Sequence, residues 1–211
     1  MSKYRNDDTD FRGDENEGKI PIDPISFAIR GTDGKDLFNE LGIPRPDSVM
    51  SSLVGDDDLF MFCAAMINDS VLQTVDDRCS LTPEFGAAIR QFGDYAFLFL
   101  SAELEDRLSK ARENHTPGFG FMSGPIIYRD LAVFNSEEYK KTYRLTGSLY
   151  DPFFVKSIDY KIQNEWRLVI VGSEEKLSPN NGDAFSINIG AFNWGFIFHS
   201  DTLIKTLELV L

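Results

Sequence analysis

Cysteine and histidine are scarce in this chain, which has two of each among its 211 residues. Two cysteines in so long a chain do not form a disulfide framework, and we expect both to stay reduced. The sequence also lacks a Cys-x-x-Cys pair and a pair of histidines at helical spacing, which are the usual marks of a zinc site. We therefore expect no resident metal.

Long apolar runs are missing as well. The longest ones, such as residues 95–100, have the length of a β-strand and fall far short of the roughly 20 residues that a membrane-spanning helix needs. The first 19 residues lack the apolar stretch of a secretory signal. These absences predict a protein without a membrane partner, located in the cytoplasm.

Basic residues are too few to balance the acidic ones, since 21 Lys and Arg stand against 34 Asp and Glu, for a formal net charge of -13. Such a charge repels the backbone of DNA or RNA and argues against direct nucleic-acid binding. Phenylalanine, in contrast, is abundant with 18 residues, and aromatic residues make up 13% of the chain. This composition predicts a folded core built largely on rings.

The chain divides at about residue 20. Residues 1–19 mix acidic and basic side chains and hold almost no aliphatic residue, so we expect a flexible acidic arm that is either mobile or ordered only on contact with a partner. Residues 20–211 should form a single domain. Its strands and helices are mixed without regular strand–helix–strand spacing, which predicts an α+β fold of mixed, mostly antiparallel sheets with flanking short helices.

Local signals place the expected elements. Thr82 and Pro83 are a typical helix start, and glycines at 42 and 93 are plausible helix ends. The helices so predicted lie at 35–41, 83–92, 102–114 and just after residue 136. The predicted strands lie at 25–30, 59–63, 95–100 (as a central strand), 125–129, 159–171, 184–189 and 195–199. A glycine-rich loop is expected over 117–124, and residues 201–211 fit either a strand or a helix.

The most informative stretch runs from Lys156 to Arg167, where a lysine and the aromatic Tyr160 precede Gln163 and Glu165. It resembles the C-terminal signature of a large family of uncharacterised bacterial and phage proteins, a domain of unknown function. In that family a lysine precedes an aromatic residue and then a Glu-x-Glu-x-Arg strand. Here Gln163 replaces the first glutamate and Tyr160 the usual tryptophan. The likeness extends loosely from residue 59 to residue 211.

The same stretch is also similar to a second family. Residues 163–165, Gln-Asn-Glu, resemble the Gln/Glu-x-Glu element of ADP-ribosyltransferases, and Arg30-Gly31 resembles the first-strand arginine that anchors the phosphates of NAD there. In that family a hydroxyl-bearing strand lines the nicotinamide pocket, and residues 60–64 would be its counterpart, with Cys63 in place of Ser or Thr. The resemblance implies an enzyme that takes NAD as a substrate and that belongs to a bacterial or phage conflict system.

The chemistry of such a site can be stated from the residues. Cleavage of the bond between nicotinamide and ribose develops an oxocarbenium ion, which the carboxylate of Glu165 would stabilise. Gln163 lies two residues earlier and would point from the same face of an extended strand. The guanidinium of Arg30 suits a pyrophosphate, because its fork of donors pairs with two oxygens at once. A ring such as Tyr160, Phe62 or Tyr128 would stack on the nicotinamide.

The local charge agrees with an anionic ligand. Residues 129–167 hold seven bases and six acids, a net charge of +1 in a chain whose total is -13. This is the one long stretch in which an anionic ligand is not repelled.

Other interpretations stay open at this point. Lys161, Gln163, Glu165 and Arg167 have the period of an exposed strand face whose side chains pair with neighbours, Arg30 fits a simple salt bridge, and Cys63 fits an inert core position. The function alternative is a non-catalytic acidic protein that imitates nucleic acid and binds a basic protein partner. An enzyme requires Arg30, Gln163 and Glu165 to converge on one pocket, whereas a mimic needs carboxylates on a convex face. The acceptor and the oligomeric state do not follow from the sequence.

Overall fold

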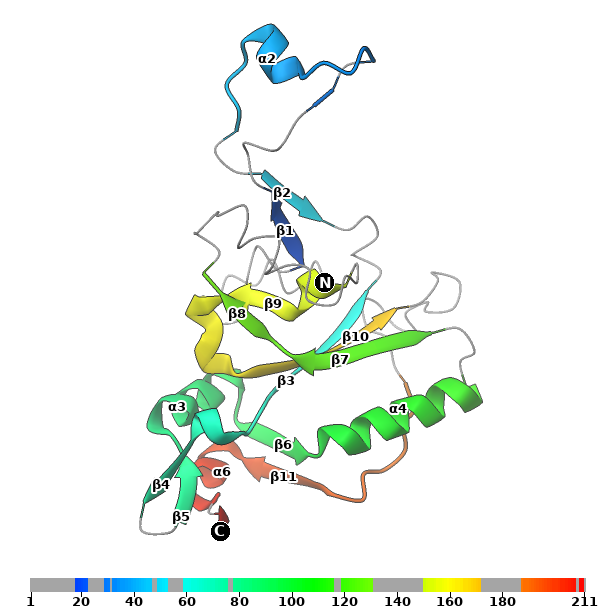
Figure 1. The fold of residues 1–211 in the computed structure, drawn as a ribbon. Helices are drawn as coiled ribbons and strands as arrows, with labels where there is room; N and C mark the ends of the chain where they lie inside the picture. Colours follow the sequence, from blue (N-terminus) through cyan, green and yellow to red (C-terminus); the bar gives the residue numbers. More distant parts are fainter. Residues whose placement is uncertain are drawn as a thin grey trace.

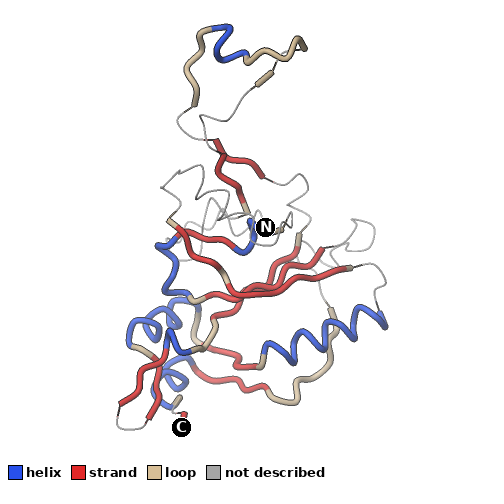
Figure 2. The backbone as a smooth tube through the Cα atoms, in the orientation of Figure 1, coloured by secondary structure: helices blue, strands red, loops and turns tan. Residues whose placement is uncertain are grey.

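The fold is α+β. The computed structural model describes residues 18–22, 29–30, 32–46, 49–52, 59–75, 78–115, 119–130, 150–171, 187–207 and 209–210. Within these ranges, every pairing of strands but one is antiparallel, and helices flank the sheets (Figures 1 and 2). The expected fold class is therefore confirmed. The predicted N-terminal arm lies almost wholly outside the described residues.

A three-stranded antiparallel sheet forms the centre of the molecule, in the order β3 (Phe60–Ala65), β10 (Glu165–Val171), β7 (Gly120–Pro125). The central strand β10 is buried along almost its whole length, as a strand covered on both faces must be. On one face Trp166 and Leu168 pack against the long helix α4 (Ser101–His115).

The other face of β10 packs against the turn that precedes β9. Val169 lies there in a cluster with Leu59 and the fully buried Phe153. Because side chains alternate along a strand, Glu165 and Arg167 point to this same face. The alternation thus directs two charged side chains into the interior.

A second sheet lies beside the first and contains only β6 (Tyr95–Phe99) and β11 (Gly195–His199) within the described part of the chain. The prediction of a central strand at 95–100 is therefore wrong in its placement. The side chain of Tyr95 is 73% exposed and that of Ile197 is 74% exposed. A two-stranded sheet has too few neighbours to bury both of its faces, which explains why these apolar residues stay exposed.

The remaining elements lie outside these two sheets, and α2 projects furthest from them (Figure 1). They comprise the antiparallel pair β1 (Lys19–Ile22) and β2 (Val49–Ser52), the helix α2 (Leu37–Leu41), the sheet of β4 (Leu72–Val75), β5 (Arg78–Leu81) and β12 (Leu209–Val210), the helices α3 (Pro83–Phe92) and α6 (Ser200–Thr206), and the parallel pair β8 (Ile127–Arg129) and β9 (Val155–Ser157). Short 3₁₀ turns complete them: η2 (Asp69–Val71), η3 (Asp151–Phe154) and η4 (Ile158–Gln163).

The helix ends follow the local signals. The hydroxyl of Thr82 accepts a hydrogen bond from the backbone N–H of Phe85, with Pro83 in the first turn, so α3 begins where the sequence predicts. Gly42 ends α2 in the left-handed conformation at φ 64°, which glycine adopts without strain. The predicted helix at 102–114 is confirmed as α4.

Other predicted elements need correction. The strand expected over 159–171 begins only at Glu165, because residues 158–163 form η4. Part of the expected glycine-rich loop is strand β7. Residues 201–206 continue α6, and β12 follows at 209–210, so the end of the chain contains both alternatives. Residues 187–189 form no strand, while 25–28 and the segment after 136 lie outside the described residues.

Candidate functional site

Four polar side chains meet where β10 begins, and all four are buried: Lys156, Gln163, Glu165 and Arg167. The ammonium group of Lys156 donates to Oε1 of Gln163 at 2.8 Å and to Oε2 of Glu165 at 3.2 Å. Nε of Arg167 donates to Oε1 of Glu165, and its Nη1 donates to the carbonyl oxygen of Phe153 at 2.7 Å. The interpretation of Gln163, Glu165 and Arg167 as part of an exposed strand face is therefore wrong, although Lys161, in η4, is exposed.

The turn at Asn164 brings Gln163 and Glu165 together. Gln163 is the last residue of η4, Asn164 has a left-handed backbone with φ 42°, and Glu165 is the first residue of β10. Met66 fixes this turn, because its N–H donates to the carbonyl of Asn164 at 2.7 Å and its own carbonyl accepts from Nδ2 of Asn164 at 2.5 Å. The sequence predicted that Gln163 and Glu165 point from the same face of one strand. This is wrong: the two side chains come together because the backbone turns at Asn164.

Lys156 comes from β9 and is only 3% exposed. Besides its two hydrogen bonds, its ammonium group lies 4.7 Å from the centre of the Tyr160 ring, a cation–π contact. Tyr160, predicted to stack on a ligand, therefore turns its ring toward Lys156 and is not among the residues that line the pocket.

The carboxyl group of Glu165 is held in its ionised form. Burial acts to raise its pKa, but the charge and hydrogen bond of Arg167, then the charge of Lys156 and the hydrogen bond from Cys63, lower it to about 2. Burial raises the pKa of Tyr128 to about 12, and its neutral hydroxyl accepts from the backbone N–H of Glu165 at 2.8 Å. The site thus presents a carboxylate flanked by two cations and a neutral phenol.

A cavity of about 910 Å³ opens beside this cluster, and Lys156, Gln163 and Glu165 belong to its wall. It lies between strands β3 and β6, each of which pairs on one side only within the described residues. Most of the remaining wall is apolar and rich in rings: Phe62, Phe85, Phe92, Tyr95, Phe97, Phe99, Trp166 and Trp194. The pocket therefore combines one polar corner with an aromatic lining, as small-molecule sites do.

Two predicted residues on β3 lie at this pocket. Phe62 lines it, with its side chain 44% exposed and its ring centre 6.2 Å from that of Phe99. Cys63 also lines it and is exposed, with a hydrogen bond from its thiol to Glu165, so the interpretation as an inert core residue is wrong. The reason is that β3 is an edge strand of the central sheet. The other cysteine, Cys79, is buried in β5.

The predicted phosphate anchor does not reach the pocket. Arg30 is exposed, donates to the carbonyl of Gly34 at 3.2 Å and pairs through its backbone with Asp36. Its segment leads into α2, which lies far from β10 (Figure 1). Asp36 of the same segment also forms an ion pair with Arg45. Gly31 lies outside the described residues.

Sequence reasoning missed several residues of the pocket. Lys156 is the lysine of the family signature, but the sequence assigns it no role in the site, although it links the two predicted catalytic side chains. Trp194 and the rings of β6 were not considered as ligand contacts. The clustering of aromatic residues at 95–99 and 194–198 is the signal that pointed to them.

The comparisons with known proteins add nothing to this geometry, because no family model, no curated protein and no solved structure matches the chain. In the part of the chain that the structure describes, no helix is long and apolar enough to cross a membrane. The same residues contain no group of three or more His, Cys, Asp or Glu side chains placed to hold a metal ion.

The turn at Asn164 can be tested by substitution. Asn164→Ala removes the side-chain hydrogen bond to Met66 and places an ordinary residue in the left-handed region, so we expect a loss of about 2 kcal/mol in the free energy of unfolding. Asn164→Gly also loses the hydrogen bond but tolerates the backbone conformation, and it should retain about 1 kcal/mol more. Urea unfolding measures both variants. Equal losses would contradict the role assigned to the backbone.

The buried carboxylate predicts a pH-dependent stability. Glu165→Gln leaves Lys156 and Arg167 buried without a counter-charge, which should cost about 3–5 kcal/mol at pH 7. The pKa of Glu165 falls from 4.5 to about 2 on folding, so its contribution is present above pH 4.5 and is lost as the pH falls toward 2. Urea unfolding from pH 7 to pH 2 should therefore show the wild type and Glu165→Gln converging.

The control for this comparison is Glu113→Gln, at an exposed position of α4. Its stability should follow that of the wild type at every pH. A difference between wild type and Glu165→Gln that stays constant down to pH 2 would refute the ionised, ion-paired state of Glu165.

Proposed function

We propose that the chain is an ADP-ribosyltransferase-like enzyme that cleaves the bond between nicotinamide and ribose in NAD, with Glu165 as the catalytic carboxylate. One observation carries the proposal: Glu165, together with Gln163, lines an aromatic pocket and is ionised over the whole neutral range, with a pKa of about 2. The pocket volume of about 910 Å³ lies within the range of small-molecule sites.

The low pKa favours NAD over ordinary glycosides. Hydrolysis of an O-glycoside needs a protonated carboxylic acid to protonate the leaving oxygen, and such acids have raised pKa values. Glu165 cannot supply a proton at neutral pH. The nicotinamide of NAD is already cationic, and it leaves as a neutral molecule with the electron pair of the broken C–N bond. A site whose carboxylate is permanently ionised suits a leaving group that needs no proton.

The hydrogen bonds of Glu165 leave room for a substrate. A carboxylate has about four acceptor positions, and Arg167, Lys156 and Cys63 occupy three of them. The fourth would accept a ribose hydroxyl, which places the negative charge beside the developing oxocarbenium ion. Water or an acceptor then forms a bond to the ribose carbon and gives up its proton to solvent.

Lys156 takes the place that the sequence gave to Arg30. It is the one lysine or arginine among the described residues that line the pocket, and it holds Gln163 and Glu165 in a fixed relation. In this proposal its charge also favours the phosphates of the dinucleotide. The same lysine, glutamate and arginine carry the resemblance to the uncharacterised bacterial and phage family, so we extend the proposal to the signature of that family and to host–phage conflict.

The pocket is also what favours an enzyme over the acidic binding protein of the alternative hypothesis. A protein that imitates nucleic acid needs a charged outer surface, and no feature of that role calls for a buried carboxylate beside an aromatic cavity.

Release of nicotinamide from NAD by the purified protein tests the proposal, with and without a host lysate that contains acceptors. Glu165→Asp keeps the charge that Lys156 and Arg167 require but withdraws the carboxylate, so it should fold and release nicotinamide at least about 100-fold more slowly. Glu113→Gln, far from the pocket on α4, should keep the wild-type rate. Chromatography of the products measures the rates.

If the folded wild-type protein releases no nicotinamide, either with or without the lysate, the proposal of an NAD-cleaving enzyme is overturned. Capture of a basic protein, with binding that weakens steeply as salt rises, would then favour the acidic binding protein.

A further inference from the structure

The segment that precedes β11 contributes Trp194 to the wall of the pocket. Trp194 lines the cavity and its side chain is 40% exposed, whereas the chain's other tryptophan, Trp166, is only 7% exposed. Phe192, in the same segment, contacts the rings of Phe97 and Phe99, with ring centres 5.3 Å and 5.6 Å apart. This wall therefore packs directly on the aromatic residues of β6.

Gly195 shows how closely the wall approaches β6. A Cβ atom at this position would lie 2.9 Å from two ring atoms of Phe97, closer than real Cβ contacts allow. A larger residue here would require the ring of Phe97 to shift. The position of the neighbouring Trp194 is thus restricted from one side by β6.

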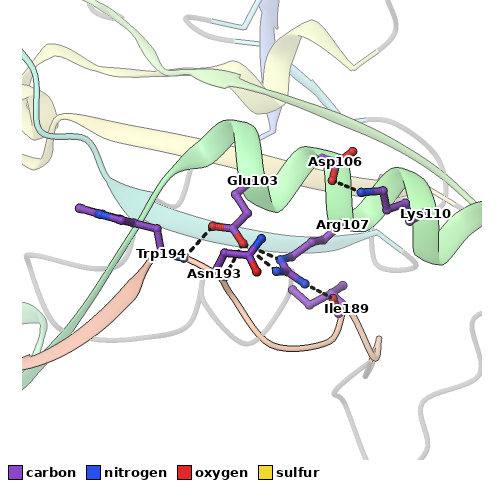
Figure 3. Close-up of polar contacts among 7 residues, drawn as sticks. All are labelled: Glu103, Asp106, Arg107, Lys110, Ile189, Asn193 and Trp194. Carbon is purple, nitrogen blue, oxygen red and sulfur yellow. Dashed lines mark hydrogen bonds and ion pairs between the residues drawn. The ribbon is translucent and has the colours of Figure 1, made fainter.

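Two side chains of α4 hold the wall from the other side (Figure 3). The carboxylate of Glu103 accepts hydrogen bonds from the backbone N–H groups of Asn193 at 2.6 Å and Trp194 at 3.1 Å. Arg107 binds the same carboxylate at 2.7 Å and 3.0 Å and donates to the carbonyl of Ile189 at 3.3 Å. One turn of helix therefore fixes both ends of residues 189–194. We refer to Glu103 and Arg107 as the α4 clasp.

The α4 clasp holds the backbone of Trp194 and leaves its indole available. The indole of Trp194 makes an edge-on contact with the ring of Phe196, at 5.1 Å between ring centres. An edge-on contact leaves a face of the indole uncovered, in agreement with the 40% exposure. A tryptophan with a fixed backbone and an uncovered face in a pocket wall is suited to bind a flat ring.

The chemistry of that ring follows from the indole. Tryptophan has the most electron-rich face of the aromatic side chains and attracts cationic and electron-poor rings most strongly. The nicotinamide of NAD is such a ring, since it is a cation until the glycosidic bond breaks. The adenine at the other end of the dinucleotide is neutral and is a weaker partner by this argument.

We infer that Trp194 binds the cationic nicotinamide ring of the substrate and that Glu103 is the positioning residue that holds Trp194 in the pocket wall. The inference rests on the proposed function for the identity of the ligand. The α4 clasp itself follows from the hydrogen bonds of Glu103 and Arg107 and can be measured without a substrate.

Tryptophan fluorescence tests the ligand. Trp166→Phe leaves Trp194 as the single tryptophan, and NAD, nicotinamide mononucleotide and ADP-ribose are titrated against it. NAD and nicotinamide mononucleotide should quench the emission to saturation, while ADP-ribose, which lacks the nicotinamide ring, should not. If Trp166→Phe does not fold, the difference between wild type and Trp194→Phe gives the same signal. Quenching by ADP-ribose but not by the mononucleotide would overturn the assignment of the ring.

Calorimetry tests the energetic role. Trp194→Ala should weaken NAD binding about tenfold and Trp194→Phe less, because the phenyl ring keeps part of the stacking. Equal affinities of wild type and Trp194→Ala for NAD would overturn the inference while the proposed function stands. Affinity that depends on Trp194, in a protein that releases no nicotinamide, would instead keep the inference and reject the function. No binding of NAD at all would overturn both.

A double-mutant cycle tests the α4 clasp. Glu103→Ala should increase quenching of Trp194 by acrylamide and weaken NAD binding, and its effect on affinity should vanish in the Trp194→Ala background. If Glu103 does not act through Trp194, Glu103→Ala should change the affinity for NAD by the same factor with or without Trp194→Ala. Such additive losses of affinity would overturn its role as a positioning residue. The matched control is Asp106→Asn on the same helix, because Asp106 pairs with Lys110 at 2.5 Å and does not hold the wall (Figure 3). It should change neither quenching nor affinity.

Discussion

The ion pairing of the buried Glu165 is the interaction on which the site depends. Its carboxylate accepts hydrogen bonds from Arg167 on the same strand and from Lys156 on β9. Both cations are almost fully excluded from water. A buried cation without a counter-charge costs several kcal/mol, so neither β9 nor β10 can move away alone. The ion pairs thereby link the parallel pair β8–β9 to the central sheet and set the position of Gln163 through Lys156.

The same ion pairs decide what chemistry Glu165 can perform. Two neighbouring cations outweigh the effect of burial and keep the group ionised, which excludes it as a proton donor at neutral pH. A carboxylate in this state acts through its charge and its remaining lone pair. Glu165 also lines the cavity of about 910 Å³.

The pocket exists because two sheets stay separate. Strands β3 and β6 each leave one edge unpaired within the described residues, and the cavity lies between these edges. Unpaired edges are normally covered or charged, because they invite pairing with other chains. Here aromatic side chains from both strands fill much of the interval, and the α4 clasp brings residues 189–194 against them to close one wall.

The α+β class followed from the mixed order of strand and helix patterns along the chain. Local sequence also predicted the start of α3 at Thr82 and the end of α2 at Gly42, because the hydrogen bonds of these caps lie within a few residues. It also selected Gln163 and Glu165, which the structure does bring together. The sequence does not predict why these two side chains meet. The left-handed turn at Asn164 that brings them together is fixed by Met66, about 100 positions away. A period-two row of polar residues has the same pattern whether it faces water or a buried lysine. The fold is needed to distinguish the two cases, because the burial of this row is set by segments distant in sequence.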